Sequence, residues 1–475
     1  MKESWLRKLP SVDFLLADKQ AFTLIERFGR EAFVNACRSA LDELRSLILQ
    51  DRTSAPEEAF SSERLFCRVK SRLEQKFSPS LQKAVNATGI IMHSGLGRAV
   101  LSGAAREALD DVTRGYCTLA LEIETGRRGQ RDSHVSRLLG ELTGAEAATI
   151  ANNNAAATVL ILNTLAKGKE VIVSRGQLVE IGGSFRMPDV MKTSGAILHE
   201  VGTTNKTHLR DYAEAINENT GAILRVHHSN YRIVGFVEEP GVEELAELGK
   251  KHNVPVVDDL GSGALVDLQE FGLQTEPLIG RSVRAGAAVV CFSGDKLIGG
   301  PQSGIIVGKA EFISRIKKNP LARAFRCGKL TVAALEATLK LFLTPEKLKQ
   351  RHPLYRMLSL DLEELEKRAR RVDRALRKRL PPEAQLSVED GGSQVGSGAV
   401  PVETIPTKLL SLKAAFMAAD EMARALRLNN PPIFTRIHKE AVLFDFRTIQ
   451  PDEDNLVQEA ILKIFEKPAA RNAHD

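Results

Sequence analysis

The stretch AAVVCFSGDKLIGGPQSGIIVGK (residues 287–309) sets Lys296 in a bend of small and turn-forming residues between two apolar runs. An amine on a flexible stem normally stays in water, where its charge is hydrated. A lysine that a buried strand delivers to a glycine-rich bend therefore either reaches back to solvent or is reactive. The rest of the sequence has to decide between these two interpretations.

Short apolar runs alternate with helical stretches between about residues 145 and 310. The runs are AATIAN, EVIVSR, AILHEV, AILRVHHS, VPVVDD, AAVVCF and GIIVGK, and NNAAATVLILNTLAKG and VEELAELGKKHN are typical of helices. Strands that are apolar on both faces and separated by helices indicate a mostly parallel sheet covered on both sides. The sequence therefore predicts a doubly wound α/β domain.

Ligands of such sheets bind beyond the carboxyl ends of the strands. Those ends are polar at Asn152 to Asn154, Ser174 to Gly176, Gly202 to Thr204, His227 to Asn230, Asp258 to Asp259 and Ser293 to Lys296. Each one taken singly is explained as a turn or a cap, because Ser, Asn, Asp and Gly are ordinary turn formers. Together they predict a polar pocket along one edge of the sheet.

A lysine and an aspartate in one pocket are what pyridoxal phosphate requires from a protein. The lysine forms the Schiff base, and the carboxylate keeps the ring nitrogen protonated. Lys296 and Asp259 are the candidates, and the helix start at Asn152, Asn153 and Asn154 is suited to the phosphate. This chemistry needs no metal. GxxxxGK[ST], GxGxxG and HExxH motifs are absent from the sequence.

The length and composition are those of an ordinary globular protein rather than of a small binding module. The chain has 475 residues, 43% hydrophobic and 27% charged, with a formal net charge of +6. No run is long enough to cross a bilayer and no signal peptide is evident, so we expect a cytoplasmic protein with five reduced cysteines. The basic helical segment 365–380 is explained either as a solvated helix or as a nucleic-acid surface.

The order of the elements predicts three domains. Residues 1–80 have helical periodicity, with breakers at Pro10 and in TSAPEE (53–58). Residues 81–344 form the large α/β domain. Residues 345–475 are expected to form a smaller α+β domain, with hairpin character in PPIFTRIHKEAVLFDFRTI (431–449).

Long ordered motifs carry a resemblance to a known family. They include NATGIIMHSGLGRA (86–99), ETGRRGQRDSHV (124–135), SRGQLVEIGGSFRMPDVM (174–191), HHSNYRIVGF (227–236), FSGDKLIGGPQSGIIVGK (292–309) and LARAFRCGKLTVAALEATL (321–339). The sequence resembles bacterial selenocysteine synthases, the L-seryl-tRNA(Sec) selenium transferases, nearly throughout its length. The resemblance implies a fold type I pyridoxal phosphate enzyme, similar in architecture to aspartate aminotransferase.

The resemblance also implies an activity. L-seryl-tRNA(Sec) would lose its hydroxyl by β-elimination to aminoacrylyl-tRNA, and selenium from selenophosphate would add to give L-selenocysteinyl-tRNA(Sec). Lys296 matches the cofactor lysine and Asp295 a residue that the family regards as catalytic. Further family positions match the anion-binding residues Arg98, Arg131, Arg323 and Arg326, and the pocket residues Thr203, Thr204 and Asn230.

The N-terminal helices resemble the family's tRNA-binding domain, and the family forms a ring of ten subunits built from five dimers. Two positions depart from the family pattern. Gly95 stands where asparagine is usual, and Asp132 stands where tyrosine is common. A carboxylate beside Arg131 would weaken its attraction for an anion, so the departures put selenophosphate binding, rather than cofactor binding, in question.

Two other functions remain open from the sequence. One is a related pyridoxal phosphate lyase of a small amino acid or an amino sugar phosphate, for which Arg436 is a candidate carboxylate clamp. The other is a tRNA-binding relative that has lost catalysis, which retention of Lys296, Asp295 and Asp259 argues against.

Overall fold

The computed structural model describes residues 6, 9–50, 61–183, 185–228, 230–273, 276–400 and 403–466. By the contacts between its residues the chain forms two compact units, Met1–Lys83 and Ala84–Asp475. The three-domain division made from the sequence stays a prediction. The breaker segment 53–58 and the strand-end residue Ser229 lie outside the described residues. No helix of the described part combines the length and apolar character that crossing a bilayer demands.

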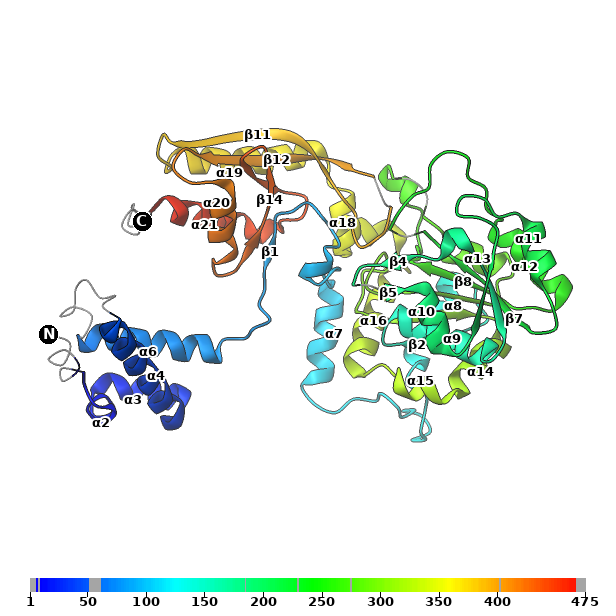
Figure 1. Cartoon of the computed structure of the whole chain (residues 1–475), viewed down its shortest axis with the longest axis horizontal. Helices are drawn as coiled ribbons and strands as arrows, with labels where there is room; N and C mark the ends of the chain where they lie inside the picture. The colour runs from blue at the N-terminus through cyan, green and yellow to red at the C-terminus, as the bar shows by residue number, and fades with distance from the viewer. Residues whose placement is uncertain are drawn as a thin grey trace. The chain divides into compact units, whose positions relative to one another are not determined.

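The first unit is helical, as Figure 1 shows in blue. Its helices are α2 (Val12–Leu16), α3 (Lys19–Phe28), α4 (Arg30–Leu49) and α6 (Ser62–Phe77). Ser11, Asp18 and Ser61 begin three of them, each side chain accepting a backbone N–H of the first turn. The core includes Phe33 and Phe66, whose rings stack with centroids 6.3 Å apart.

The second unit contains a seven-stranded sheet in the order β2-β10-β9-β8-β7-β3-β6. Its strands are β2 (Ala147–Ala151), β3 (Glu170–Ser174), β6 (Ile197–Val201), β7 (Thr220–Val226), β8 (Val256–Gly261), β9 (Val289–Ser293) and β10 (Gly304–Gly308). Only the pairs made by β10 are antiparallel among these seven. The seven predicted apolar runs therefore form one mostly parallel sheet, and that prediction is confirmed.

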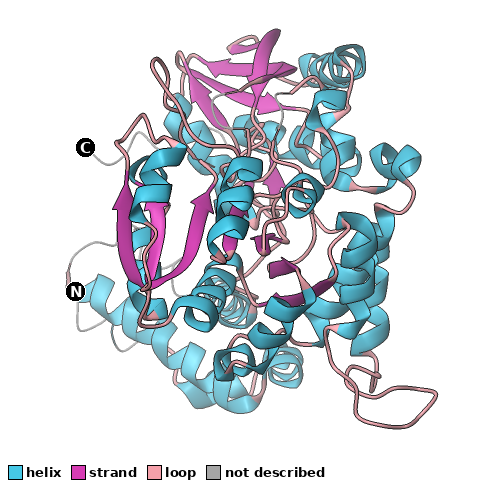
Figure 2. Ribbon diagram, turned by 90° about the vertical axis from the view of Figure 1, so that its right-hand side faces the viewer, coloured by secondary structure: helices cyan, strands magenta, loops and turns pink. Residues whose placement is uncertain are grey.

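Helices cover both faces of this sheet (Figure 2). Successive strand residues point to opposite faces, and the residues on both faces are apolar, so both faces need to be covered. In β9, Val290 and Phe292 enter one hydrophobic cluster, and Val289 and Cys291 enter the other. The first cluster includes α8 (Ser133–Thr143), α13 (Ile279–Arg284) and α16 (Lys329–Leu341); the second includes α9 (Asn154–Ala166), α10 (Met187–Ser194) and α14 (Ala310–Lys318). Further helices are α7 (Gly103–Thr113), α11 (Leu209–Ala215), α12 (Val242–His252), α15 (Pro320–Ala324) and α17 (Leu348–Arg351).

A second, antiparallel sheet follows in the order β11-β12-β15-β14. Its strands are β11 (Ala384–Ser393), β12 (Ile405–Ala414), β14 (Arg436–His438) and β15 (Ala441–Asp445), and its helices are α19 (Leu362–Arg377), α20 (Ala419–Arg427) and α21 (Asp454–Glu466). β14 and β15 pair as a hairpin, which confirms the hairpin predicted within 431–449. The short β13 (Ile433–Phe434) pairs instead with β1 (Val85–Asn86), and β4 (Glu180–Ile181) pairs with β5 (Phe185–Arg186).

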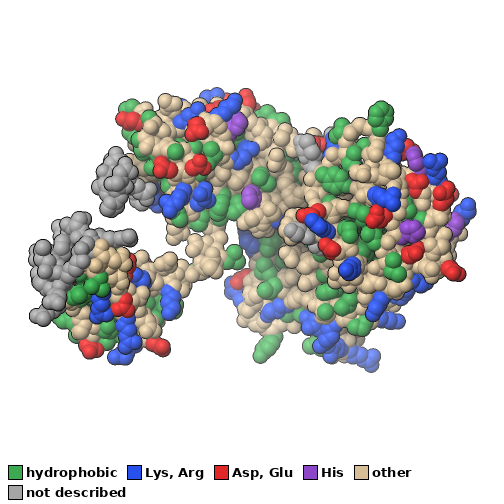
Figure 3. Space-filling model, viewed as in Figure 1, with side chains coloured by type: hydrophobic (Ala, Val, Ile, Leu, Met, Phe, Trp, Pro, Cys, Tyr) green, Lys and Arg blue, Asp and Glu red, His purple; other side chains and the backbone are tan. Residues whose placement is uncertain are grey.

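The basic segment 365–380 falls largely on α19, where five of its basic side chains form ion pairs with acidic side chains. Arg368 is buried and pairs with Asp454 at 2.7 Å. Arg370 pairs with Glu366, and Arg377 with Asp373, each four residues away on the same helix. On the face drawn in Figure 3, basic and acidic side chains are interspersed. This pairing favours the solvated-helix interpretation over a nucleic-acid surface.

The bend that carries Lys296 joins β9 to β10 and is closed by its own backbone. The Gly300 N–H donates to Gly294 O, and the Gly299 N–H donates to Lys296 O, both at 2.8 Å. Gly299 has a φ of 65°, and a Cβ at that position would overlap the ring of His352. Glycine is therefore required there by both conformation and space.

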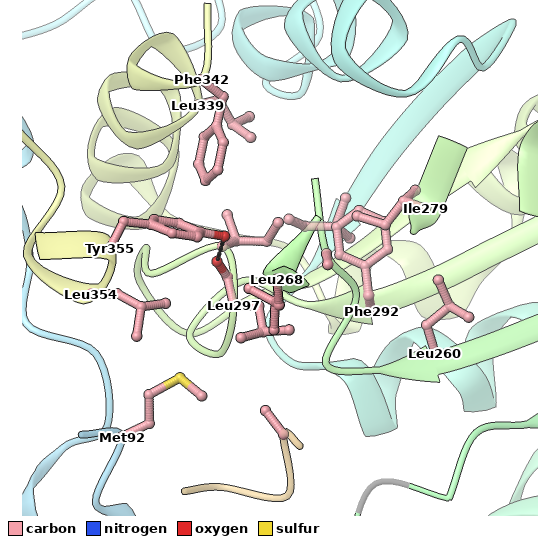
Figure 4. Packing of buried hydrophobic residues seen from close by; sticks show 14 of the residues in the cluster. Met92, Leu260, Leu268, Ile279, Phe292, Leu297, Leu339, Phe342, Leu354 and Tyr355 are labelled. Atoms are coloured by element: carbon pink, nitrogen blue, oxygen red, sulfur yellow. Dashed lines mark hydrogen bonds between the residues drawn. The ribbon is translucent and has the colours of Figure 1, made fainter. Parts of the chain in front are cut away.

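Two side chains from beyond residue 345 hold the carbonyls that follow Lys296. Tyr355 in α18 (Pro353–Leu358) donates its hydroxyl to Leu297 O at 2.9 Å, drawn as the dashed line in Figure 4. His352 Nε2 lies 3.0 Å from Ile298 O. Because a carbonyl only accepts, the His352 ring carries its proton on Nε2. Both side chains are fully buried, so the bend is fixed against the core.

Burial lowers the pKa of His352 from 6.5 to about 4. Such a histidine binds a proton more tightly in the unfolded chain than in the folded one. Its neutral form therefore leaves the folded state at full stability above pH 6.5, and the free energy of unfolding decreases as the pH falls toward 4. We predict that wild type loses on the order of 3 kcal/mol of unfolding free energy over this range relative to His352→Gln, which keeps an N–H donor but does not titrate. Chemical denaturation at several pH values measures this, and a pH-independent difference would contradict it.

Candidate active site

Asp259 and Lys296 come from neighbouring parallel strands of the central sheet. Asp259 in β8 is in register with Cys291 in β9, and Lys296 follows β9 at the start of the bend. Both residues are buried, with 4% of Asp259 and 7% of Lys296 exposed. Because parallel strands end at one edge of a sheet, the fold brings these two charged groups into one pocket, as the sequence predicts.

Neutral donors surround the Asp259 carboxylate. Asn154 Nδ2 donates to one oxygen and Thr158 Oγ1 to the other, both at 2.8 Å, and the Gly261 N–H adds a third bond at 3.1 Å. Within the described residues no ion pair reaches this carboxylate. Burial raises the pKa of Asp259, and the three hydrogen bonds and the Lys296 charge only oppose that rise. The carboxylate is therefore held in place without a cation to compensate it.

The Lys296 amine is held in an environment that disfavours its charge. Burial lowers its pKa most, and the Arg98 guanidinium lowers it further, against the opposing charges of Asp259, Asp295 and Glu276. Among the described residues, no hydrogen bond or ion pair occupies Nζ. A buried amine with a lowered pKa is a nucleophile and a proton acceptor, which excludes the interpretation of Lys296 as a lysine reaching back to solvent.

Asp295, the residue before the lysine, pairs with Arg98 at 2.7 Å. Arg98 follows the short 3-10 turn Ser94–Leu96 and has a φ of 61°, which is uncommon for a residue other than glycine. The structure thus brings Arg98 to the residue that precedes Lys296. The predicted role of Arg98 in anion binding stays a prediction.

The three predicted asparagines lie at the start of α9. Asn153 caps the helix by accepting the Ala156 N–H at 2.8 Å, and Asn154 reaches Asp259. The Asn154 Oδ1 atom is buried and has no hydrogen-bond partner among the described residues. Asn152 donates its backbone N–H to Phe325 O at 2.9 Å. The N-terminus of α9 thus adjoins both the Asp259 carboxylate and the segment around Phe325, which contains Arg323 and Arg326.

That segment and the loop before α8 together form an arginine cluster, which we define as Arg128, Arg131, Arg323 and Arg326. Arg131 Nη1 donates to Cys327 O at 3.4 Å and ties the two segments together. The pKa of Arg326 is lowered, first by the charge of Arg131 and also by those of Arg323 and Arg128. Guanidinium groups whose charges act on that of Arg326 in this way suit a multiply charged anion, and the anion-binding roles of these arginines stay predictions.

Two family models match the chain. The model described as L-seryl-tRNA selenium transferase matches residues 84–450, and the model described as selenocysteine synthase N terminal matches residues 6–45. The chain belongs to the L-seryl-tRNA selenium transferase family.

Relatives named L-seryl-tRNA(Sec) selenium transferase align over nearly the whole chain. The protein from Alkaliphilus metalliredigens is 47% identical over 96% of this chain and 98% of its own length. The Geotalea daltonii protein is 46% identical with the same two coverages, and the Methylocella silvestris protein is 48% identical over 94% of each chain. The predicted resemblance to this family is confirmed.

A solved structure shows the fold. "Structure of D-Glucosaminate-6-phosphate Ammonia-lyase" superposes with a TM-score of 0.57 at 19% identity, covering 83% of this chain and 98% of that one. The predicted α/β fold with a mostly parallel sheet, the fold of type I pyridoxal phosphate enzymes, is confirmed.

The structure resolves one of the two departures from the family pattern. Asp132 precedes α8 and its carboxylate pairs with Lys317 at 2.9 Å. No ion pair joins Asp132 to Arg131 in the described part of the chain. The Asp132 carboxylate is thus paired with Lys317 of α14 and not with Arg131. At the other departure, a Cβ on Gly95 would lie 3.3 Å from the His93 ring, so a larger residue requires His93 to move.

Three residues predicted for the pocket make their hydrogen bonds elsewhere. Thr203 Oγ1 donates to Lys206 O at 2.9 Å within its own turn, and Thr204 is exposed beside it. Asn230 is exposed and donates to Glu180 O at 2.8 Å. None of the three bonds to Asp259 or Lys296 in the described residues, and their roles stay predictions.

Sequence reasoning missed Thr158, Arg128 and Glu276. Thr158 lies four residues after Asn154 on α9, so the two side chains share a helix face, and this spacing was a usable signal. Arg128 stands three residues before Arg131, but only the fold shows that it joins Arg323 and Arg326. Glu276 has no sequence signal, because its effect on Lys296 depends on a long-range contact.

We predict that substituting the two adjacent aspartates has different effects on the unfolding free energy of the cofactor-free protein. Asp258 is fully buried and pairs with Arg225 at 2.9 Å, so Asp258→Asn leaves a guanidinium uncompensated and lowers the unfolding free energy by about 3–5 kcal/mol. Asp259→Asn removes an unpaired buried charge and is expected to cause no loss. Urea denaturation compares the two variants, and an equal loss for both would contradict the proposed electrostatics of Asp259.

Proposed function

We propose that this protein converts L-seryl-tRNA(Sec) to L-selenocysteinyl-tRNA(Sec) with selenophosphate, using pyridoxal phosphate. Family membership supports the reaction. The single observation that carries it is that a buried Asp259 carboxylate and a buried Lys296 amine are placed at the ends of neighbouring parallel strands. The arginine cluster nearby supplies a site for the anionic co-substrate.

The residues at the sheet edge fit the cofactor. Lys296 would hold its aldehyde, Asp259 its ring nitrogen, and the α9 N-terminus at Asn152 and Asn153 its phosphate. The unpartnered Asn154 Oδ1 and the cation-free Asp259 carboxylate are both polar groups that a bound cofactor would satisfy. When bound, the cofactor supplies an electron sink for the carbanions of elimination and addition.

The chain's own groups account for the proton transfers. Lys296 has the lowered pKa of a group that removes the proton from the substrate Cα and later returns it. Asp295 stands next to it, and its carboxylate is oriented by Arg98. We assign to Asp295 the handling of the proton at the leaving hydroxyl. Arg98 then serves as the link between that carboxylate and an incoming anion.

The arginine cluster is proposed to hold selenophosphate. Guanidinium groups present paired N–H donors that match phosphate-type oxygens, and their mutual repulsion is relieved when an anion binds. The backbone bond from Asn152 to Phe325 O ties this cluster to the cofactor side of the pocket. The first unit is proposed to bind the tRNA, and the assembly to be a homodecamer of five dimers, as the family resemblance implies.

The rival lyase function finds less support. Its candidate carboxylate clamp, Arg436, pairs with the fully buried Asp445 at 3.2 Å and donates to Gly392 O at 2.9 Å. A guanidinium committed to a buried carboxylate is a structural group of the antiparallel sheet. The likeness to the ammonia-lyase structure supports the fold and does not extend to its substrate.

Conversion of seryl-tRNA(Sec) in the presence of selenophosphate tests the proposal. We predict selenocysteinyl-tRNA from wild type and from the control Lys309→Ala, which changes an exposed lysine between β10 and α14. Lys296→Ala is expected to lose at least about a thousandfold in rate. Comparable turnover by Lys296→Ala, or cofactor binding with no product from wild type, would refute the assignment.

A further inference from the structure

A cavity of about 230 Å³ lies beyond the end of β7, and the proposed chemistry does not use it. Two histidine–glutamate pairs line it. His227 Nε2 lies 3.4 Å from Glu276 Oε2, and His228 Nε2 lies 3.4 Å from Glu239 Oε1. The volume is below the range usual for whole drug-sized ligands. It suits a fragment such as a sugar ring.

Glu276 is the unusual member of this lining. Only 4% of the residue is exposed, and one carboxylate oxygen accepts the Val400 N–H. The other oxygen, Oε2, is buried and faces His227 Nε2 at 3.4 Å, but it makes no hydrogen bond in the described part of the chain. A buried acceptor that makes no hydrogen bond is unfavourable. The cavity therefore offers an unfilled position for a hydrogen-bond donor.

The cavity lies beside the strand that carries Asp259. The His227 backbone N–H donates to Asp259 O at 2.9 Å, which joins the cavity wall to the strand that carries the pocket carboxylate. Glu276 is one of the three acidic groups whose charge acts on the Lys296 amine. A ligand in this cavity is thus close to the atoms that react at Lys296.

The charge of the lining selects among ligands. Glu239, Glu276 and Glu403 contribute three carboxylates, against one guanidinium from Arg232. An anion such as selenophosphate is repelled here and attracted to the arginine cluster. Hydroxyl groups, which donate to carboxylates and carry no charge, suit this lining. The structure therefore separates a site for an anion from a site for a hydroxyl-bearing group.

We propose that this cavity binds the ribose of the 3′-terminal nucleoside of seryl-tRNA, with Glu276 accepting a hydrogen bond from the 2′-hydroxyl. The inference rests on the proposed function. Ester linkage joins this ribose to the seryl carbonyl, so it has to lie beside the group that reacts at Lys296. The 2′-hydroxyl is also the feature by which a protein distinguishes RNA from DNA at a given position.

Seryl-tRNA(Sec) ending in 2′-deoxyadenosine, with serine on the 3′ oxygen, is the probe. It is compared with the ribose form for kcat/KM on the holoenzyme and for equilibrium binding to the cofactor-free full-length chain. Wild type is expected to prefer the ribose form by at least about tenfold, as for a hydrogen bond to a charged group. In Glu276→Gln the preference falls to about threefold or less, and in Glu276→Leu, which has no acceptor, it disappears.

Glu243→Gln is the matched control, because Glu243 is an exposed glutamate that pairs with Arg281 outside the cavity. This variant is expected to keep the full preference. Equal use of both tRNA forms by wild type overturns the inference and leaves the proposed function standing. An undiminished preference in Glu276→Gln and Glu276→Leu assigns 2′-hydroxyl recognition to other residues and overturns the role of Glu276. Conversion of neither form overturns the proposed function and this inference together.

Discussion

The candidate site depends on a buried carboxylate, that of Asp259, with which no cation forms an ion pair in the described part of the chain. Asp259 is fixed by Asn154, Thr158 and the Gly261 N–H, all of them neutral donors, and burial raises its pKa. Such an arrangement costs stability in the cofactor-free chain, since a buried charge without a partner is unfavourable. The neighbouring pair, Asp258 with Arg225, has the same depth but is compensated. The contrast marks Asp259 as a group held for a ligand.

The amine that faces this carboxylate is positioned by parts of the chain far apart in sequence. Its strand, β9, ends at the sheet edge, and the following bend is closed by glycines whose replacement would cause overlap with neighbouring atoms. The carbonyls of Leu297 and Ile298 are then held by Tyr355 and His352. The bend therefore depends for its shape on residues beyond 345. A lysine presented in this way loses little freedom when it reacts.

Periodicity was sufficient to predict the central sheet, because strands apolar on both faces read as continuous runs between helices. It was also sufficient to place Asp259 and Lys296 together, since neighbouring parallel strands share an edge. It could not reveal Glu276 or the pairing of Asp132 with Lys317, which depend on contacts between distant segments. The anion-binding role of Arg98, which the family resemblance implies, stays a prediction, and the structure adds its ion pair with Asp295. The ion-pair partners of charged residues on loops depend on tertiary contacts, which the spacing of residues in the sequence does not reveal.

Basic and acidic side chains gather at different places in the second unit. Arginines gather around Arg326, and carboxylates line the cavity beside β7. Charges of both signs act on the amine of Lys296. The account as a whole depends on a covalent bond between that amine and pyridoxal phosphate. Borohydride reduction of the purified protein followed by peptide mapping measures it directly. The account predicts a pyridoxyl group on Lys296 alone, and its absence there, or its presence on another lysine, would contradict the account.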